Sequence, residues 1–447
     1  MGLITFNQYM EISSIIFIVL LIVAGGLFFK NLKTIVRNIK LGKDLDRNDR
    51  KNERFSLMAR VALGQSKMVV RPFAGFLHIV VYVGFIIINI EVLEIVLDGI
   101  LGTHRLFAFM GGFYHFLIAA FEGLALLVLV ACVIFLIRRN VLRIKRFFGK
   151  EMTAWPKTDA NLILITEILL MSAFLIMNAA DAQLQVLGSS HYTNVGSFPI
   201  SRQLMGAFAG MSESSLIMLE RGTWWFHIIG IFAFLNYLPY SKHFHILLAF
   251  PNVFYSKLVP KGQLDNLASV KKEVEMMFDP SADPYAAPAE PEGEPQRFGA
   301  KDVTDLTWKQ LMDAYTCTEC GRCTDVCPAN ITGKALSPRK IMMDTRDRLE
   351  EVGKGIDKNG KDFTDNKSLL RDYISEEELL ACTSCNACVQ ACPVNNDPLS
   401  IIVDLRRFLI MEESKAPAEW TGIFTNIENN GAPWQFAQAD RLNWKNE

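Results

Sequence analysis

The chain has 447 residues, a formal net charge of −1, 50% hydrophobic residues and 21% charged residues. This composition excludes a disordered chain, which needs low hydrophobicity and high net charge, and it offers no basic domain for nucleic acid. Apolar runs concentrate before residue 250, whereas eight of the nine cysteines lie between residues 317 and 392. The sequence therefore predicts two parts, one rich in apolar segments and one rich in cysteine.

Five apolar segments are long enough to cross a bilayer as helices, for which about 20 residues are needed. They cover residues 12–29, 73–97, 108–137, 161–180 and 223–246. Twelve Lys and Arg residues lie in 30–71 and seven in 138–157, but only one in 98–105 and two in 181–222. Because cytoplasmic loops carry the excess of positive charge, we expect the N-terminus outside and everything after about residue 250 in the cytoplasm.

Histidines in these segments fall at two depths. His78 and His245 lie near the inner side, and His115 and His227 lie near the outer side. The eighteen residues from His227 to His245 are five whole turns of a continuous helix, so both would leave one face, whereas His243 would point away. Two axial imidazoles are what a six-coordinate b-type haem needs. The four histidines therefore predict two stacked haems.

Single histidines in a span usually serve packing or hydrogen bonding, so the paired depths carry this interpretation. His104 is the spare candidate for the outer haem. Glu122 and Glu91 also lie in predicted spans, where acidic residues are costly and often functional. They are candidates to supply protons to a quinone, although an interhelical or intersubunit hydrogen bond explains each equally well.

A proline-containing stretch separates the two halves. Residues 279–296 hold five prolines with alanine and glutamate, which is typical of an extended spacer. We therefore divide the chain into a membrane domain over 1–250, a cytoplasmic linker over 251–299, a cysteine domain over 300–412 and a tail over 413–447. Tryptophans of the tail could dock a partner or pack on the cysteine domain; they are Trp420, Trp434 and Trp444.

Two cysteine runs both follow the pattern C-x2-C-x2-C-x3-C-P, the spacing of two-cluster bacterial ferredoxins. Three cysteines of such a run hold one [4Fe-4S] cluster, and the fourth holds the other cluster. The first cluster is therefore assigned to Cys317, Cys320, Cys323 and Cys392. The second cluster is assigned to Cys382, Cys385, Cys388 and Cys327.

Zinc is the alternative occupant, but a zinc site usually needs only two C-x2-C pairs. The insert between the runs has helical patterns at 337–352 and 375–381 and almost no strand pattern. The expected fold class is all-α: a five-helix transmembrane haem-binding bundle followed by a cytoplasmic α-helical two-cluster ferredoxin domain.

These motifs carry a family resemblance. The cysteine domain resembles the C subunit of heterodisulfide reductase and related iron–sulfur oxidoreductases, including the G-x-x-L-S-P turn at residues 333–338. The membrane half resembles the E subunit of that enzyme and the gamma subunit of respiratory nitrate reductase, in residues 239–242 followed by His245. The chain thus resembles a fusion of the E and C subunits.

The nitrate reductase gamma subunits place two haem histidines on their second helix, whereas this chain has only His78 there, so His115 would have to substitute. Single-chain relatives continue into cysteine-rich CCG domains, which implies a separate cytoplasmic CCG-domain subunit here. The resemblance implies a multi-pass protein of the prokaryotic cytoplasmic membrane, surrounded by lipid.

It also implies electron transfer between a cytoplasmic CCG-domain or flavoprotein partner, the two clusters, haem b and a quinone. An electron-transfer flavoprotein or an organic-acid dehydrogenase is the expected donor. Quinol-driven reduction of a disulfide is the second interpretation. A membrane transporter or scaffold with a structural zinc domain is the alternative of another class.

Overall fold

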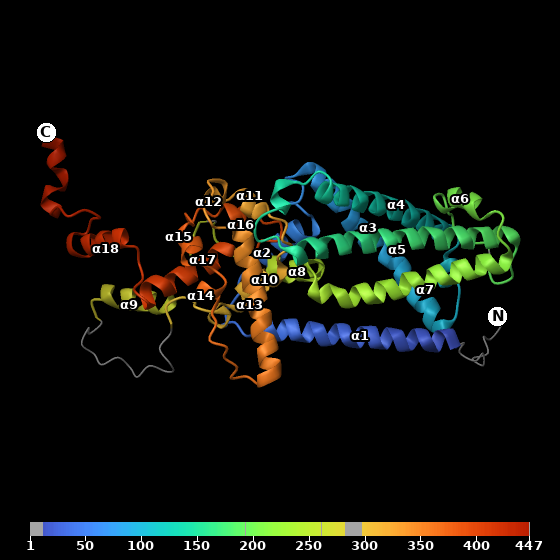
Figure 1. Ribbon diagram of the computed structural model, residues 1–447, viewed down its shortest axis with the longest axis horizontal. Helices are drawn as coiled ribbons and strands as arrows, with labels where there is room; N and C mark the ends of the chain where they lie inside the picture. The colour runs from blue at the N-terminus through green and yellow to red at the C-terminus, as the bar shows by residue number, and fades with distance from the viewer. Residues whose placement is uncertain (1–11, 193, 261, 282–296, 447) are drawn as a thin grey trace.

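The computed structural model describes residues 12–192, 194–260, 262–281 and 297–446. The longest helices form one end of the elongated molecule, and most of the helices at the other end are short (Figure 1). The described residues are mostly helical and contain no sheet, only two isolated bridges between Lys43 and Thr307 and between Leu370 and Ile374. The prediction of a helical protein is confirmed at this level.

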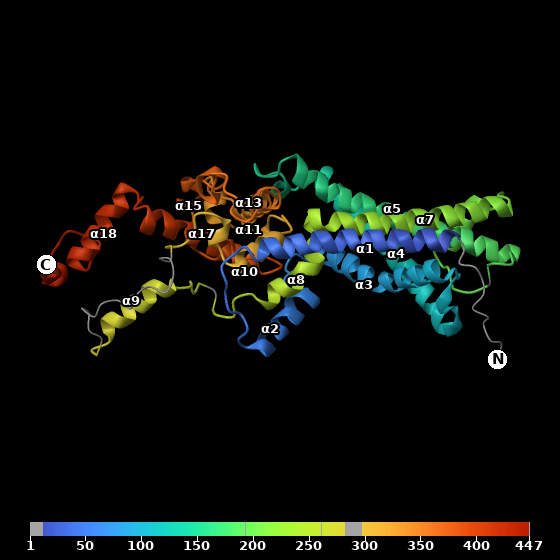
Figure 2. The ribbon, with the colours of Figure 1, turned by 90° about the horizontal axis from the view of Figure 1, so that it is seen from below.

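Four helices among the described residues are long and apolar enough to cross a membrane: α1 (Ile12–Ile39), α3 (Pro72–Leu101), α4 (Gly112–Asn140) and α5 (Ala154–Leu187). They run alongside one another in both views (Figures 1 and 2). Large apolar side chains such as Ile22, Leu93 and Leu127 remain at least half exposed on them. Such extended apolar surface is typical of helices that face lipid or another protein.

The fifth predicted span, 223–246, is wrong in its bounds. Helix α7 (Glu213–Tyr237) begins ten residues earlier, where the Ser212 hydroxyl accepts from the Ser215 amide, and it ends before Pro239. Proline cannot continue the hydrogen-bond ladder, and Ser241 takes an extended conformation. Helix α7 packs along α5, but it is not among the helices that meet the length and composition of a span.

Helices of the membrane half continue into the cysteine half. The last turn of α1 reaches α10 (Trp308–Thr316), where the Asn38 amide donates to the Tyr315 hydroxyl at 2.9 Å. Helix α8 (His245–Phe254) crosses the predicted boundary at residue 250. Its buried Asn252 donates to the Asn396 side chain at 2.8 Å. The beginning of the predicted linker therefore belongs to the packed core.

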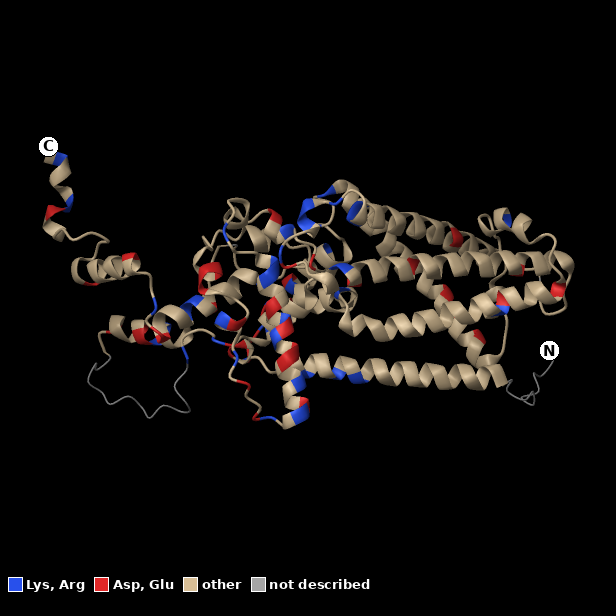
Figure 3. Ribbon diagram, in the orientation of Figure 1, with Lys and Arg blue, Asp and Glu red and all other residues tan. Residues whose placement is uncertain are grey.

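The cysteine half is built around α10, α13 (Pro338–Asn359) and α17 (Pro398–Arg407). Their apolar faces meet in a core that is fully buried at Leu311, Ile341, Leu349, Ile401 and Leu405. Charged side chains gather on this half and are sparse along the long helices (Figure 3). Much of the predicted proline-containing spacer, 282–296, lies outside the described residues.

Helices α9 (Ala268–Phe278) and α18 (Ala418–Asn430) extend beyond the cysteine core, away from the long helices (Figures 1 and 2). Neither helix contains a buried residue. Trp434 and Trp444 remain exposed in the segment after α18. The tail therefore leaves these two tryptophans unburied by the cysteine core.

A buried ion pair joins the two halves. Arg339, which is 1% exposed, bonds the Glu151 carboxylate at 2.7 Å and the Arg146 carbonyl at 2.6 Å. We expect Arg339→Ala to lower the free energy of unfolding by about 3–5 kcal/mol, because it leaves a buried carboxylate unpaired. Thermal unfolding in detergent measures this loss.

The matched control is Arg297→Ala, which removes an exposed pair with Asp305. That variant should change the unfolding free energy by at most about 1 kcal/mol. Equal losses in the two variants would contradict the role of the buried pair.

Candidate functional site

The two cysteine runs have the same backbone course. Glu319 and Ser384, each before the second cysteine of its run, have φ of 52° and 55°. Gly321 and Asn386, each after that cysteine, have φ of 72° and 60°. These left-handed residues bend the chain tightly, which turns the thiols of each run toward one side.

The thiols gather around two separate cavities. The first is lined by Cys317, Cys320, Cys323 and Cys392. The second is lined by Cys327, Cys382, Cys385 and Cys388. The structure thus brings together the same two groups that the spacing predicts, with the fourth cysteine of each run crossing to the other cavity.

The donor set suits a polynuclear cluster. Each cavity is lined by four thiols, the number of protein ligands that a [4Fe-4S] cluster takes. Backbone amides donate to the cavity thiols, from Asn396 to Cys392 at 3.2 Å and from Ser384 to Cys382 at 3.4 Å. Hydrogen bonds to sulfur are one means by which a protein tunes a bound cluster.

Burial of the thiols opposes their ionisation. It raises the pKa of the Cys317 thiol to about 12 and that of Cys392 to about 11. Iron binds the thiolate form, so assembly of a cluster must release these protons. The buried thiols therefore fit ligands whose charge a cluster compensates.

Two inner histidines lie together. The rings of His78 on α3 and His245 at the start of α8 have centres 6.4 Å apart. Nδ1 of His245 donates to the Lys242 carbonyl at 2.9 Å, so that Nε2 carries the lone pair with which this ring could bind a metal, and Nδ1 of His78 is buried without a partner. Iron between two opposed imidazoles sets ring centres about 6 Å apart, given metal–nitrogen bonds of about 2 Å.

His227 and His245 do not share one continuous helical face as predicted, because the chain unwinds between α7 and α8. His245 reaches His78 through the turn at residues 238–244 instead. His243 lies beside His245, with ring centres 5.8 Å apart and nearly perpendicular planes. Its ring also packs on Phe234.

The structure does not pair the outer histidines. His115 is exposed, whereas His227 is buried and bonds the Leu170 carbonyl at 3.0 Å through Nδ1. No ring contact joins these two histidines in the described residues. His104, the spare candidate, instead lies beside His191, with ring centres 5.6 Å apart, and 3.5 Å from the Asp181 carboxylate.

A buried charge network that the sequence analysis missed lies at the C-terminal end of α3. Arg105, 7% exposed, pairs with Asp181 at 2.8 Å and with Glu91 at 3.1 Å. The second carboxylate oxygen of Glu91 is buried without a partner. Glu122 instead accepts from the Ile200 amide at 2.9 Å, from the Ser201 amide and from the Asn178 side chain. Glu122 therefore fits a structural role better than Glu91 does.

Arg105 offered one signal in the sequence, since it is the lone basic residue of the 98–105 loop. Its position at the end of a span is equally typical of an exposed flanking residue, so burial could not be inferred from it.

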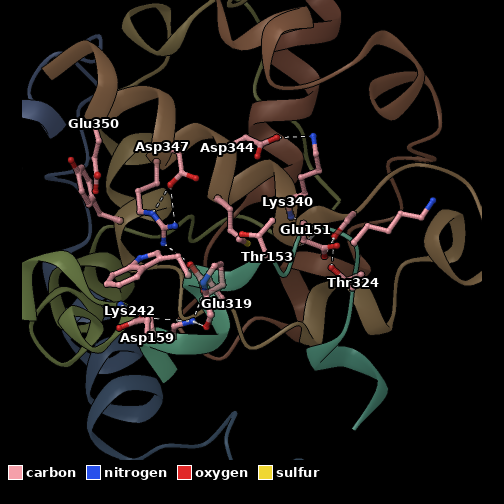
Figure 4. Close-up of a pocket in the computed structure, with 18 of the residues that line it drawn as sticks. Glu151, Thr153, Asp159, Lys242, Glu319, Thr324, Lys340, Asp344, Asp347 and Glu350 are labelled. Carbon is pink, nitrogen blue, oxygen red and sulfur yellow. Dashed lines mark hydrogen bonds and ion pairs between the residues drawn. The ribbon is translucent and has the colours of Figure 1, made fainter. Parts of the chain in front are cut away.

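A polar junction links the inner histidine to the first cysteine run. Lys242 bonds Glu319, which lies between Cys317 and Cys320, and also the Pro156 carbonyl at 2.7 Å. Glu319 in turn accepts from Arg346 at 2.8 Å. These side chains line a cavity of about 1210 Å³ between the two halves (Figure 4). Burial raises the pKa of the Glu319 carboxyl, but the neighbouring Arg346 and Lys242 cations lower it by more. The pKa of Glu319 therefore lies below its usual value.

Comparison with known proteins identifies the chemistry of the cysteine half. Residues 316–396 match the family described as 4Fe-4S dicluster domain. The chain is 28% identical, over 99% of its own length and 62% of the relative's, to a Bacillus subtilis protein described as an iron-sulfur-binding oxidoreductase, FadF. It is 26% identical to an EtfAB:quinone oxidoreductase of Syntrophomonas wolfei, over 97% of this chain and 59% of that relative.

A third relative is the C subunit of a CoB–CoM heterodisulfide reductase from Methanosarcina acetivorans, 29% identical over 26% of this chain and 60% of the relative. The chain spans about three-fifths of the length of its two longest-matching relatives. No solved structure matches it. The chain is thus a relative of iron–sulfur oxidoreductases, and residues 316–396 of its cysteine half are similar to 4Fe-4S dicluster domains.

Replacing either Cys317 or Cys392 by alanine should abolish the same cluster signal in electron paramagnetic resonance, because both thiols line the first cavity. Replacing Cys388 should abolish the other signal. Iron should fall by about half in each variant, since each cubane holds four irons.

The control is Cys132→Ala, a buried cysteine of α4 that lines neither cavity. It should keep full iron and both signals. Loss of different signals in the Cys317 and Cys392 variants would refute the crossed arrangement.

Proposed function

We propose that this chain is a membrane-anchored electron-transfer subunit of a respiratory oxidoreductase. It would pass electrons between a cytoplasmic partner, two [4Fe-4S] clusters, haem b and the quinone pool. The observation that carries the proposal is the meeting of the His78 and His245 rings, together with the bond from Lys242, three residues before His245, to Glu319 of the first cysteine run. The cofactors would supply the redox chemistry, and the protein supplies spacing, orientation and charge.

His78 and His245 would be the axial ligands of an inner haem b. Their ring separation fits one iron atom, and the Lys242 carbonyl orients His245 in the manner of an outer-shell partner. The outer pair, His115 and His227, has no comparable support. We therefore propose one haem at the inner position, and a second haem would need a ligand other than this pair.

The orientation follows the loop charges, with the N-terminus outside and the cluster domain in the cytoplasm. We also propose α7 as a fifth crossing, because it packs along α5 and is needed for this orientation. The partner would be a separate cytoplasmic iron–sulfur protein with CCG domains, an electron-transfer flavoprotein or a dehydrogenase. The exposed Trp434 and Trp444 offer that partner a docking surface.

A second candidate is quinol-driven reduction of a disulfide, favoured by the likeness of residues in the cysteine half to the C subunit of a heterodisulfide reductase. Purification in mild detergent with identification of the accompanying proteins distinguishes the two. A flavoprotein or dehydrogenase supports the first function, and a disulfide reductase supports the second.

Exchange of His245 for alanine should remove the reduced-state absorption band of b-type haem, because one axial ligand is lost. The matched control is His243→Ala, two residues away on the same turn, which should keep the band. Visible spectra of the two purified, dithionite-reduced variants make the measurement. A full haem band in His245→Ala would refute the ligand assignment.

Glu91→Gln should slow quinone reduction by about 100-fold, because the carboxyl with a free buried oxygen can no longer deliver a proton. Haem and cluster spectra should stay unchanged. In the comparison variant, Glu122→Gln, the folded protein should keep its turnover but unfold at a lower temperature, since Glu122 bonds two backbone amides. Slow quinone reduction in Glu122→Gln with normal turnover in Glu91→Gln would contradict this, because it would assign proton delivery to Glu122 and the structural role to Glu91.

A further inference from the structure

The two cysteine cavities differ in their relation to the membrane half. The first run contacts it at Glu319, Gly321, Arg322 and Asp325. A Cβ atom at Gly321 would lie 3.0 Å from the Arg146 carbonyl, so this turn is pressed against the loop after α4. At the equivalent position of the second run, Asn386 carries a side chain, and the neighbouring Cys385 is exposed.

Three bonds fasten the first run to the loop that enters α3. The Arg322 guanidinium donates to the Lys67 carbonyl at 2.8 Å and contacts the Met68 sulfur at 3.5 Å. Arg71 bonds Asp325 at 2.6 Å. Helix α3 begins directly afterwards, and its second turn carries His78. The same loop also reaches the fourth ligand of the first cavity, since the Lys67 ammonium donates to the Cys392 carbonyl at 3.0 Å.

The other inner histidine is fastened to the same run. Glu319 is 4% exposed and pairs with the Lys242 ammonium. The backbone carbonyl of Lys242 accepts from His245. The first cysteine run thus contacts both elements that lead to the histidines, the loop that enters α3 and the turn before α8.

Arg322 occupies the centre of this arrangement. It is 5% exposed, lines the first cavity and donates to the Lys67 carbonyl in the loop that enters α3, the helix of His78. Arg406 is its counterpart at the second cavity. It bonds the Leu379 carbonyl at 2.8 Å and the carbonyl of Cys382, which lines the second cavity.

We propose that Arg322 is a positioning residue that couples the first cluster electrostatically to the inner haem. The first cluster then exchanges electrons with the membrane domain, while the second, beside the exposed Cys385, faces the cytoplasmic partner. This inference rests on the function proposed above. The exchange moves one electron between the two centres, so one is oxidised as the other is reduced, with no bond or proton change.

A buried positive charge stabilises an added electron on a neighbouring centre. Arg322→Gln should therefore lower the reduction potentials of both the first cluster and the haem, and leave the second cluster unchanged. Arg322→Lys, which keeps the charge, should restore both potentials most of the way. The matched control, Arg406→Gln, should lower the potential of the second cluster only.

Redox titrations of the full-length protein in detergent give these potentials, with paramagnetic resonance for the clusters and visible absorbance for the haem. Lys67→Met is the second variant if Arg322→Gln does not assemble its cluster. Its lost ammonium should lower the potential of the first cluster, because Lys67 interacts with Cys392.

Wild-type protein without a haem band would overturn the proposed function and this inference together. If the wild-type protein contains haem and both clusters, the potentials of the variants test the inference about Arg322 alone. There, a haem potential that moves in Arg406→Gln, or in neither arginine variant, overturns the order of the clusters. A haem shift confined to Arg322→Gln supports it.

Discussion

The contact between Lys242 and Glu319 fixes how the membrane half and the cysteine half meet. The backbone amide of Lys242 donates to Asp159 of α5, and its carbonyl accepts from His245. Its ammonium bonds Glu319 in the first cysteine run. Buried ion pairs contribute little net stability, because removing both charges from water costs nearly as much as their attraction returns. We therefore attribute a positional role to this pair, because it holds the turn that carries His245 against the first cysteine run.

Electron transfer places a demand on such a junction that stability alone does not. Redox centres exchange electrons only when the protein holds them close and fixed, which requires rigid supporting contacts. Here the supports come from several elements that are distant in sequence: the loop before α3, the turn before α8 and the long helix α13. Arg339 and Arg346 of α13 pair with Glu151 and Glu319, so the same helix braces both the membrane half and the first run.

The polar contacts at the C-terminal end of α3 are of a different kind. Arg105 there gathers Asp181, Glu91 and Asn178 in the buried interior of the helix bundle. Charged groups at such depth persist only when paired, and they mark functional sites in membrane proteins. Most of the acceptors serve the fold: Asp98 bonds the amides of Arg105 and Leu106, and Glu122 bonds those of Ile200 and Ser201. The unpartnered oxygen of Glu91 distinguishes it within this group.

The sequence by itself determined the helical class, four of the spans, the two cysteine groups and the inner histidines as a pair. Each of these rests on local spacing: apolar length, the C-x2-C-x2-C-x3-C-P repeat, and depth along a span. Spacing failed where the backbone departed from a regular helix, because Pro239 and Ser241 break the turn count between His227 and His245. Only the tertiary structure decided that His115 is exposed, that Arg105 is buried, and that Arg322 lines the first cysteine cavity while it bonds the loop that enters α3. Those outcomes depend on contacts between residues tens to hundreds of positions apart, which no local periodicity encodes.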